Sequence, residues 1–242
     1  MNVRQSLSGF QYLIAGLGII TKPGLRRFVI IPILINLLFF LGFFFTLRHF
    51  VSEFNHWFDS YLPAWLQWLN YLIWILFFAT FVLVFIYAFV VLANLIAAPF
   101  NNLLAEKVEQ YLTGTLPPQK SLMENVGDIP RVIGRQLAIM AYYIPRALVI
   151  LILFFIPIIN VFTAIIWFIF NAWFMTMQFI DFPTDNHKIP LQEVRQWLSA
   201  RKWTALSLGA CILVAMMIPG VNLVIMPAAV AAATKFWVEE NK

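Results

Sequence analysis

The sequence has 242 residues, of which 62% are hydrophobic and only 11% are charged, whereas about 25% of residues are charged in a soluble domain. Too few charges remain to cover a water-facing surface, so the composition excludes an ordinary soluble domain and predicts an all-α integral membrane protein. The net charge of +5 comes from basic residues placed between apolar runs, which argues against nucleic acid as a partner.

The first predicted element is an amphipathic helix over residues 5–20, where apolar residues recur at helical spacing. The first membrane span is predicted over residues 25–50, because a helix of about 20 apolar residues crosses the bilayer. The second span is predicted over residues 69–113. Its apolar run reaches Ala98 and continues into a polar stretch before Gly114, so this helix is expected to project beyond the bilayer.

The third and fourth apolar runs, residues 147–180 and 203–234, each break near the middle at the same phrase, I-P-x-[IV]-N. Proline stops the first half-helix, and Asn160 or Asn222 is expected to cap the second half. Each half is short for a full span of about 20 residues. We therefore predict two re-entrant (hemi-penetrating) helical hairpins beside the two long transmembrane helices.

Amphipathic interfacial helices are expected to precede both hairpins. Each amphipathic helix and its hairpin together form one segment, residues 122–180 for the first and residues 190–238 for the second. The whole chain, residues 1–242, is expected to be a single membrane domain. An alternative for the first apolar stripe, from Ile129 to Ile144, is packing on the projecting helix. Small residues of the last hairpin, around Gly209 and Ala228–Ala232, are expected to pack closely on each other.

The basic residues fit this topology, although hairpins made of two full spans would return the chain to the same side as well. They cluster before the first span, after the second span and after the third run, whereas the predicted loop from Arg48 to Gln67 contains one basic residue. If both hairpins return to their starting side, every basic cluster lies on one face of the membrane, which is the cytoplasmic face by the positive-inside rule.

The stretch TKPGLRRF, just before the first span, is the strongest candidate for a binding site. Gly24 allows the backbone to approach a ligand, and free N–H groups of Leu25, Arg26 and Arg27 are expected at the helix N-terminus. Two arginines conflict with the helix dipole unless an anion is present, and their planar guanidinium groups suit a tetrahedral oxyanion. The alternative is that both arginines anchor the helix to lipid phosphates.

Deeper polar residues are candidates for an ion pathway or gate, although any of them can instead hydrogen-bond between helices. The half-helices that begin at Asn160 and Asn222 are expected to direct positive dipole ends toward the midplane. The candidate residues are Asn36, Asn94, Asn101, Asn102, Glu106, Arg135, Asn160 and Asn222.

Cysteine and histidine are too sparse for other site chemistry. Cys211 is the single cysteine, and the three histidines lie at no ligand-like spacing, so neither a disulfide framework, a metal site nor a cofactor is expected. The sequence also lacks G-x-S-x-G, H-E-x-x-H and a phosphate loop, so we do not expect an enzyme.

PGLRR before the first span, APFNNLLAEKVE at residues 98–109, the I-P-x-x-N repeat and the length resemble the CysZ family of bacterial sulfate permeases. The resemblance covers nearly the whole chain. It implies a multi-pass protein of the bacterial inner membrane that admits sulfate for cysteine biosynthesis. It also implies a homo-oligomer, a dimer or larger, and a sulfate site on Gly24, Leu25, Arg26 and Arg27, with sulfite as a competitor. The alternatives are a channel for another small anion and a non-transporting, lipid-organising membrane protein.

None of the four apolar runs, residues 28–47, 69–98, 147–180 and 203–234, contains an Asp, Glu, Lys or Arg residue. Proton-coupled carriers usually place an ionisable relay within a span. The nearest carboxylates are those of Glu106, Glu109 and Asp181. The sequence therefore predicts passive, channel-like conduction, with Glu106 as the first residue to test if transport is instead coupled to protons.

Overall fold

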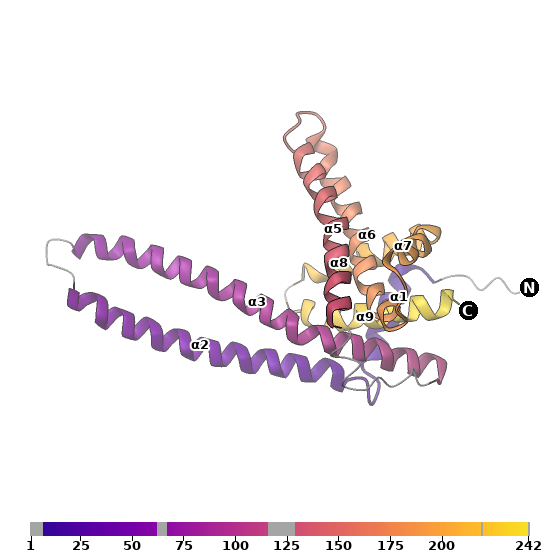
Figure 1. Cartoon of the computed structure of the whole chain (residues 1–242), viewed down its shortest axis with the longest axis horizontal. Helices are drawn as coiled ribbons and strands as arrows, with labels where there is room; N and C mark the ends of the chain where they lie inside the picture. The colour runs from indigo at the N-terminus through magenta and orange to yellow at the C-terminus, as the bar shows by residue number, and fades with distance from the viewer. Residues whose placement is uncertain (1–6, 62–66, 116–128, 219, 242) are drawn as a thin grey trace, which may run out of the picture. The chain divides into compact units, whose positions relative to one another are not determined.

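The computed structural model describes residues 7–61, 67–115, 129–218 and 220–241, and every regular element within them is an α-helix (Figure 1). The chain divides into two compact units. One is Ile30–Phe100, and the other combines Met1–Val29 with Asn101–Lys242. Three of the described helices are long and apolar enough to cross a membrane, or four if a bent pair counts as one span. The all-helical membrane protein predicted from composition is thus confirmed at this level.

The unit Ile30–Phe100 contains most of α2 (Arg27–Tyr61) and the first part of α3 (Gln67–Thr113). Within α2, Arg27–Phe50 has a mean hydropathy of 2.7 and is long enough to span the membrane. The predicted loop from Arg48 to Gln67 is mostly wrong, because α2 continues to Tyr61. No glycine or proline occurs between Arg48 and Tyr61 to interrupt the helix.

Helix α3 has 47 residues, or about 70 Å of helix, so the helix is as long as predicted, and its projection beyond the bilayer stays a prediction. It ends at Gly114, which has φ of 73° and donates its N–H to the carbonyl oxygen of Gln110 at 2.9 Å. A glycine with positive φ is a common helix terminator. The described apolar part of the second predicted span is the short stretch Trp74–Val84, so that span stays a prediction.

The core of the other unit is built on close approaches to glycine. Helix α1 (Gly9–Ile20) begins with a capping box between Ser8 and Gln11 and packs on α8 (Lys202–Met216) and α9 (Asn222–Glu240). A Cβ atom at Gly16 would lie 2.3 Å from the carbonyl oxygen of Ala228. The buried face of α1 is therefore the glycine face, and Phe10 and Ile14 of the expected apolar stripe are exposed.

Gly209 of α8 determines a second close contact, with α6 (Asn160–Asn186). A Cβ atom at Gly209 would lie 1.7 Å from the carbonyl oxygen of Ala172, and Thr176 donates a hydrogen bond to the carbonyl oxygen of Ala205 at 2.6 Å. The expectation that Gly209 faces the alanines of α9 is wrong. Gly209 packs on α6, while Ala228 of α9 packs on Gly16 of α1.

Helix α5 (Ile129–Leu153) pairs with α6 as the first hairpin (Figure 1). Both helices contain a segment long and apolar enough to cross a membrane, Gly134–Leu153 and Asn160–Asn186, so the expectation that each half is short for a full span is wrong for this hairpin. A separate interfacial helix before this hairpin was expected, but α5 is continuous from Ile129 to Leu153. Its stripe residues Leu137, Met140 and Ile144 are exposed, whereas Arg131 and Arg135 turn toward α6. The apolar face of α5 is thus exposed and its polar contacts face α6, and packing of the stripe on α3 stays a prediction.

Helix α7 (Leu191–Ala200) meets α8 at a bend of 101°. Its apolar stripe is buried in protein, not directed into the interface, because Val194 and Leu198 are fully buried. Trp197 packs on Phe236 of α9 with ring centroids 4.9 Å apart. Helix α7 therefore packs into the buried core of this unit through its apolar face.

Both hairpin tips turn through the residue after the repeated proline. Ile158 has φ of 75° and Gly220 has φ of 82°, which is the left-handed region. The predicted asparagine caps are wrong, because Asn160 and Asn222 are the first helical residues. The N-cap positions are Ile159 and Val221, and neither helix has a side-chain cap hydrogen bond. A residue already in helical conformation lies past the N-cap position, where an asparagine side chain cannot cap its own helix.

Candidate functional site

The segment before α2 is a tight turn of the same design as the hairpin tips. Gly24 follows Pro23 and has φ of 88°, and the Lys22 carbonyl oxygen accepts the N–H of Arg26 at 3.2 Å. At the first hairpin tip, Ile158 follows Pro157, and the Ile156 carbonyl oxygen accepts the N–H of Asn160 at 3.1 Å. In both places a proline and then a left-handed residue reverse the chain, so the first residues of the next helix are exposed.

The hydrogen bonds of this turn change the predicted anion site. The N–H groups of Leu25 and Arg26 both donate to the Lys22 carbonyl oxygen, at 3.1 and 3.2 Å, so the expectation that they are free is wrong. The N–H groups of Gly24 and Arg27 make no hydrogen bond within the described part of the chain. Leu25 is buried and anchors the turn, which leaves recognition to Gly24, Arg26 and Arg27.

Arg26 and Arg27 are exposed side by side. Neither forms an ion pair with a carboxylate of the described residues, and Arg27 lies over the ring of Phe28 at 5.0 Å from the centroid. Two cations without a counter-ion repel each other, and both are repelled by the partial positive charge at the helix N-terminus. An oxyanion bound to both guanidinium groups would remove this conflict.

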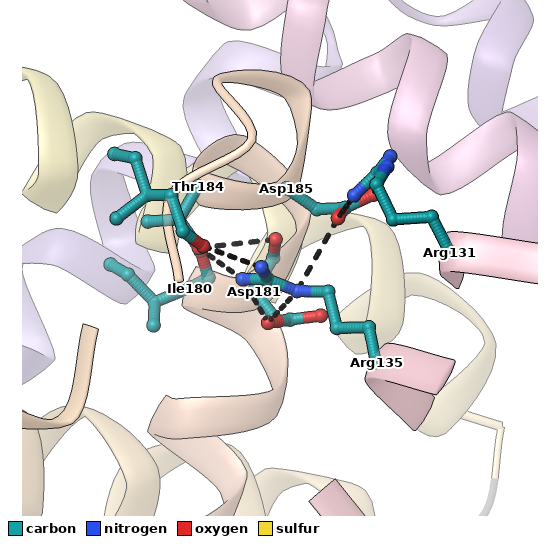
Figure 2. Close-up of polar contacts among 7 residues, drawn as sticks. Arg131, Arg135, Ile180, Asp181, Thr184 and Asp185 are labelled. Carbon is teal, nitrogen blue, oxygen red and sulfur yellow. Dashed lines mark hydrogen bonds and ion pairs between the residues drawn. The ribbon is translucent and has the colours of Figure 1, made fainter. Parts of the chain in front are cut away.

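A second polar cluster lies at the base of the first hairpin, where two arginines of α5 contact two aspartates of α6 (Figure 2). Arg135 donates to Asp181 at 2.8 Å and to the Ile189 carbonyl oxygen at 2.5 Å. Arg131 forms an ion pair with Asp185, which also lies 3.4 Å from Nε of Arg135. This arginine–aspartate clamp ties α5 to α6 and to the segment that enters α7.

The clamp was missed by sequence reasoning, although the sequence contains a signal for it. Arg131 and Arg135 are four residues apart, as are Asp181 and Asp185, so each pair lies on one face of its helix. Arg135 was predicted as a pathway residue, whereas in the structure its guanidinium group is occupied by Asp181, Asp185, Thr184 and the Ile189 carbonyl.

The other pathway candidates are dispersed. Asn160 and Asn222 are exposed at the two hairpin tips, and Asn101, Asn102 and Glu106 are half-buried on the extension of α3. The Asn102 carbonyl oxygen accepts the side-chain amide of Asn186 at 3.2 Å. The side-chain oxygen of Asn36 in α2 is buried without a partner among the described residues. Asn94 lies in α3, and its side chain is outside the described part of the structure.

The chain matches the family described as Sulfate transporter CysZ/Etoposide-induced protein 2.4 over residues 12–227. The chain belongs to this family. A CysZ relative, Sulfate transporter CysZ of Pseudomonas syringae pv. tomato, is 44% identical over 240 residues, covering 98% of this chain and 94% of the relative. Sulfate transporter CysZ of Pseudomonas fluorescens is 43% identical over 239 residues, covering 97% and 94%. The resemblance to CysZ is therefore confirmed, and with it membership of a transporter family.

Proposed function

We propose that this chain is a sulfate permease of the bacterial inner membrane that supplies sulfate for cysteine biosynthesis, and that it works as a homo-oligomer. Near-complete matches to two relatives named Sulfate transporter CysZ support the substrate. The apolar helices support a multi-pass membrane location. Light scattering of the detergent-purified protein tests the oligomer, and a strictly monomeric species would count against it.

The single observation that carries a binding role is the pair of exposed arginines, Arg26 and Arg27, that come after the left-handed turn at Gly24 and have no carboxylate partner among the described residues. Sulfate is a tetrahedral dianion, and two guanidinium groups neutralise it with directed hydrogen bonds. We therefore assign sulfate recognition to Gly24, Arg26 and Arg27, with Leu25 as the buried support.

Binding of sulfate to the purified chain tests this assignment. Arg26→Ala and Arg27→Ala should each weaken binding by about 10- to 150-fold, because a charge-assisted hydrogen bond contributes about 1.5–3 kcal/mol. Lysine at either position should restore binding only in part, since it keeps the charge and loses the planar fork. Arg48→Ala, which removes an exposed arginine of α2, is the matched control. If both variants bind sulfate like the parent, the arginines are lipid anchors.

The two hairpins are proposed to enter the membrane only part-way. Helix α8 has 15 residues, about 22 Å of helix, against a hydrocarbon core of about 30 Å. In the first hairpin, Arg146 lies seven residues before the end of α5, which is about 10 Å along the helix axis from the hairpin tip. A charged residue so close to the tip favours shallow insertion. Cysteines at Ile158 and Gly220, in a chain with Cys211 replaced, should resist impermeant thiol reagents from the side opposite the basic loops. Rapid labelling from that side would mean full spans.

Conduction is proposed to be passive. An inside-negative potential opposes entry of a dianion by about 4.6 kcal/mol per 100 mV. Accumulation against it needs a coupled ion, but Asp181 and Asp185 are held by arginines of the clamp. Radiolabelled sulfate should enter liposomes containing only this protein without a pH gradient, and more slowly when the inside is negative. Uphill uptake driven by a proton gradient alone would contradict passive conduction, and Glu106→Gln would then be the first variant to test.

A further inference from the structure

A cavity of about 950 Å³ lies between the first hairpin and α8, away from the Gly24–Arg27 turn. Its mostly apolar walls come from α5, α6 and α8, with Ser199 of α7 at one end; the apolar lining includes Val149, Ile169 and Leu206. The size is that of a ligand site, for which volumes of about 300–1,000 Å³ are usual. Val149 and Ile169 are exposed, so the cavity is an open groove along one side of the hairpin.

One end of this groove is polar. A neighbouring cavity of about 520 Å³ shares Tyr142, Trp173 and Ser199 with the groove and is also lined by Arg195 and Gln196 of α7. The two cavities adjoin at the three lining residues that they share. Together they form a feature with an apolar end along α5 and α6 and a polar end at α7.

Three cations surround the junction of the two cavities. The guanidinium carbons of Arg146 and Arg195 lie over the same ring, 4.0 and 4.2 Å from the Tyr142 centroid, and Lys202 lines the groove. No residue that lines either cavity is acidic. None of the three cations has an ion pair with a carboxylate in the described part of the chain, unlike Arg135 and Arg201 of the same unit.

Trp173 adds an unfilled hydrogen bond at the same place. It lines both cavities, and its indole N–H is buried without an acceptor among the described residues. An unsatisfied buried donor is unfavourable, so an acceptor oxygen at the junction would stabilise the site. The junction thus requires an anionic group with acceptor oxygens, and the adjoining groove requires an apolar chain.

We propose that this feature binds an anionic phospholipid, with its phosphate beside Tyr142, near Arg146 and Arg195, and an acyl chain in the groove between α5, α6 and α8. Basic pockets between membrane helices bind anionic headgroups, and only an amphiphile fills both the polar and the apolar end. The site does not depend on the sulfate-binding role proposed for Arg26 and Arg27. A free oxyanion would leave the apolar walls uncovered.

Lipid retention measured by native mass spectrometry of the full-length purified chain tests the proposal. The probes are phosphatidylglycerol and phosphatidylcholine with identical acyl chains. The parent should retain phosphatidylglycerol in preference. Replacing both arginines, Arg146→Gln with Arg195→Gln, should weaken its retention by about 10- to 30-fold, because each basic residue near a charged headgroup contributes about 1 kcal/mol.

Two further variants separate the polar from the apolar end. Ile169→Trp fills the groove and leaves the cations intact, so it should also reduce retention of phosphatidylglycerol. Arg48→Gln removes one exposed cation of α2 and should have no effect. Equal retention of both lipids by the parent, or undiminished retention by the double arginine variant, would overturn the proposal. Displacement of phosphatidylglycerol by excess sulfate would also overturn it, because the junction would then be a site for small anions.

Discussion

The arginine–aspartate clamp gives the sharpest prediction for stability. The Arg135 side chain is only 10% exposed, and that of its partner Asp181 is 16% exposed. Arg135→Ala leaves the Asp181 carboxylate without its charged partner and removes the donor to the Ile189 carbonyl. Breaking a buried ion pair from one side costs about 3–5 kcal/mol. We expect Arg135→Ala to lower the free energy of unfolding by that amount.

Arg131→Ala is the internal comparison on the same helix. The Arg131 side chain is 32% exposed, and its partner Asp185 remains 3.4 Å from Nε of Arg135 when Arg131 is lost. Only a partly solvated charged contact disappears, so the expected cost is about 1–2 kcal/mol. The double variant Arg135→Met with Asp181→Leu should be close to the parent in stability, because no unpaired buried charge remains between these positions.

Equilibrium unfolding in mixed micelles, followed by tryptophan fluorescence, measures all three variants. The expected order of stability has the parent and the apolar double variant together, then Arg131→Ala, then Arg135→Ala. Equal loss in the two single variants would mean that the burial of Arg135 does not matter. A double variant as unstable as Arg135→Ala would refute the reasoning that an unpaired buried aspartate causes the loss.

Backbone geometry gives three smaller predictions, all measured by the same unfolding assay. Gly209→Ala places a Cβ atom 1.7 Å from the Ala172 carbonyl oxygen, so it should lower the free energy of unfolding by about 1–3 kcal/mol or prevent folding. Gly18→Ala is the control, because a Cβ atom there has nothing within 4 Å, and it should be neutral or stabilising. Ile158→Gly should stabilise the first hairpin by about 1 kcal/mol, because isoleucine at φ of 75° is strained; a loss of stability would show that the Ile158 side chain has a compensating contact. Ser8→Ala removes the capping box of α1 and should cost about 1 kcal/mol; an unchanged free energy of unfolding would mean that packing alone defines the helix start.

Features of the fold that depend on uninterrupted apolar runs and on chain breakers could be predicted from the sequence. The start of α2, the end of α3 at Gly114 and the turns after Pro157 and at Gly220 are explained by helix propensity and proline or glycine positions. The extension of α2 to Tyr61 was missed, because the polarity of residues 48–61 suggested a loop although nothing there breaks a helix.

The direction of an amphipathic face could not be predicted. In water the apolar stripe of a helix faces the protein core, and α7 obeys this rule through Val194 and Leu198. In α5 the stripe with Leu137 and Met140 is exposed, and Arg135 faces α6. Both patterns look alike in sequence, and only the surroundings, lipid or protein, distinguish them.

For the candidate anion site, the residue types could be predicted and the donor set could not. Glycine with two arginines soon after it indicates an anion at a helix start, but the Lys22 carbonyl takes the N–H groups of Leu25 and Arg26. That hydrogen bonding depends on the left-handed conformation of Gly24. The φ angle of Gly24 therefore decides which backbone N–H groups remain for a ligand. A glycine in the sequence allows this left-handed conformation but does not require it.

The partial depth proposed for the first hairpin rests on where its charges lie, because apolar length alone would allow a full span. The segment Gly134–Leu153 is long and apolar enough to cross a membrane, but a full crossing would place the exposed Arg146 about 16 Å above Arg135, near the bilayer centre. An arginine there costs about 2.5–3.5 kcal/mol, with no carboxylate among the described residues to offset it. The proposed partial insertion would keep Arg146 at the headgroups, together with Arg195. The same position that limits the hairpin's depth then supplies the cations for an anionic lipid, so the two proposals support each other through Arg146.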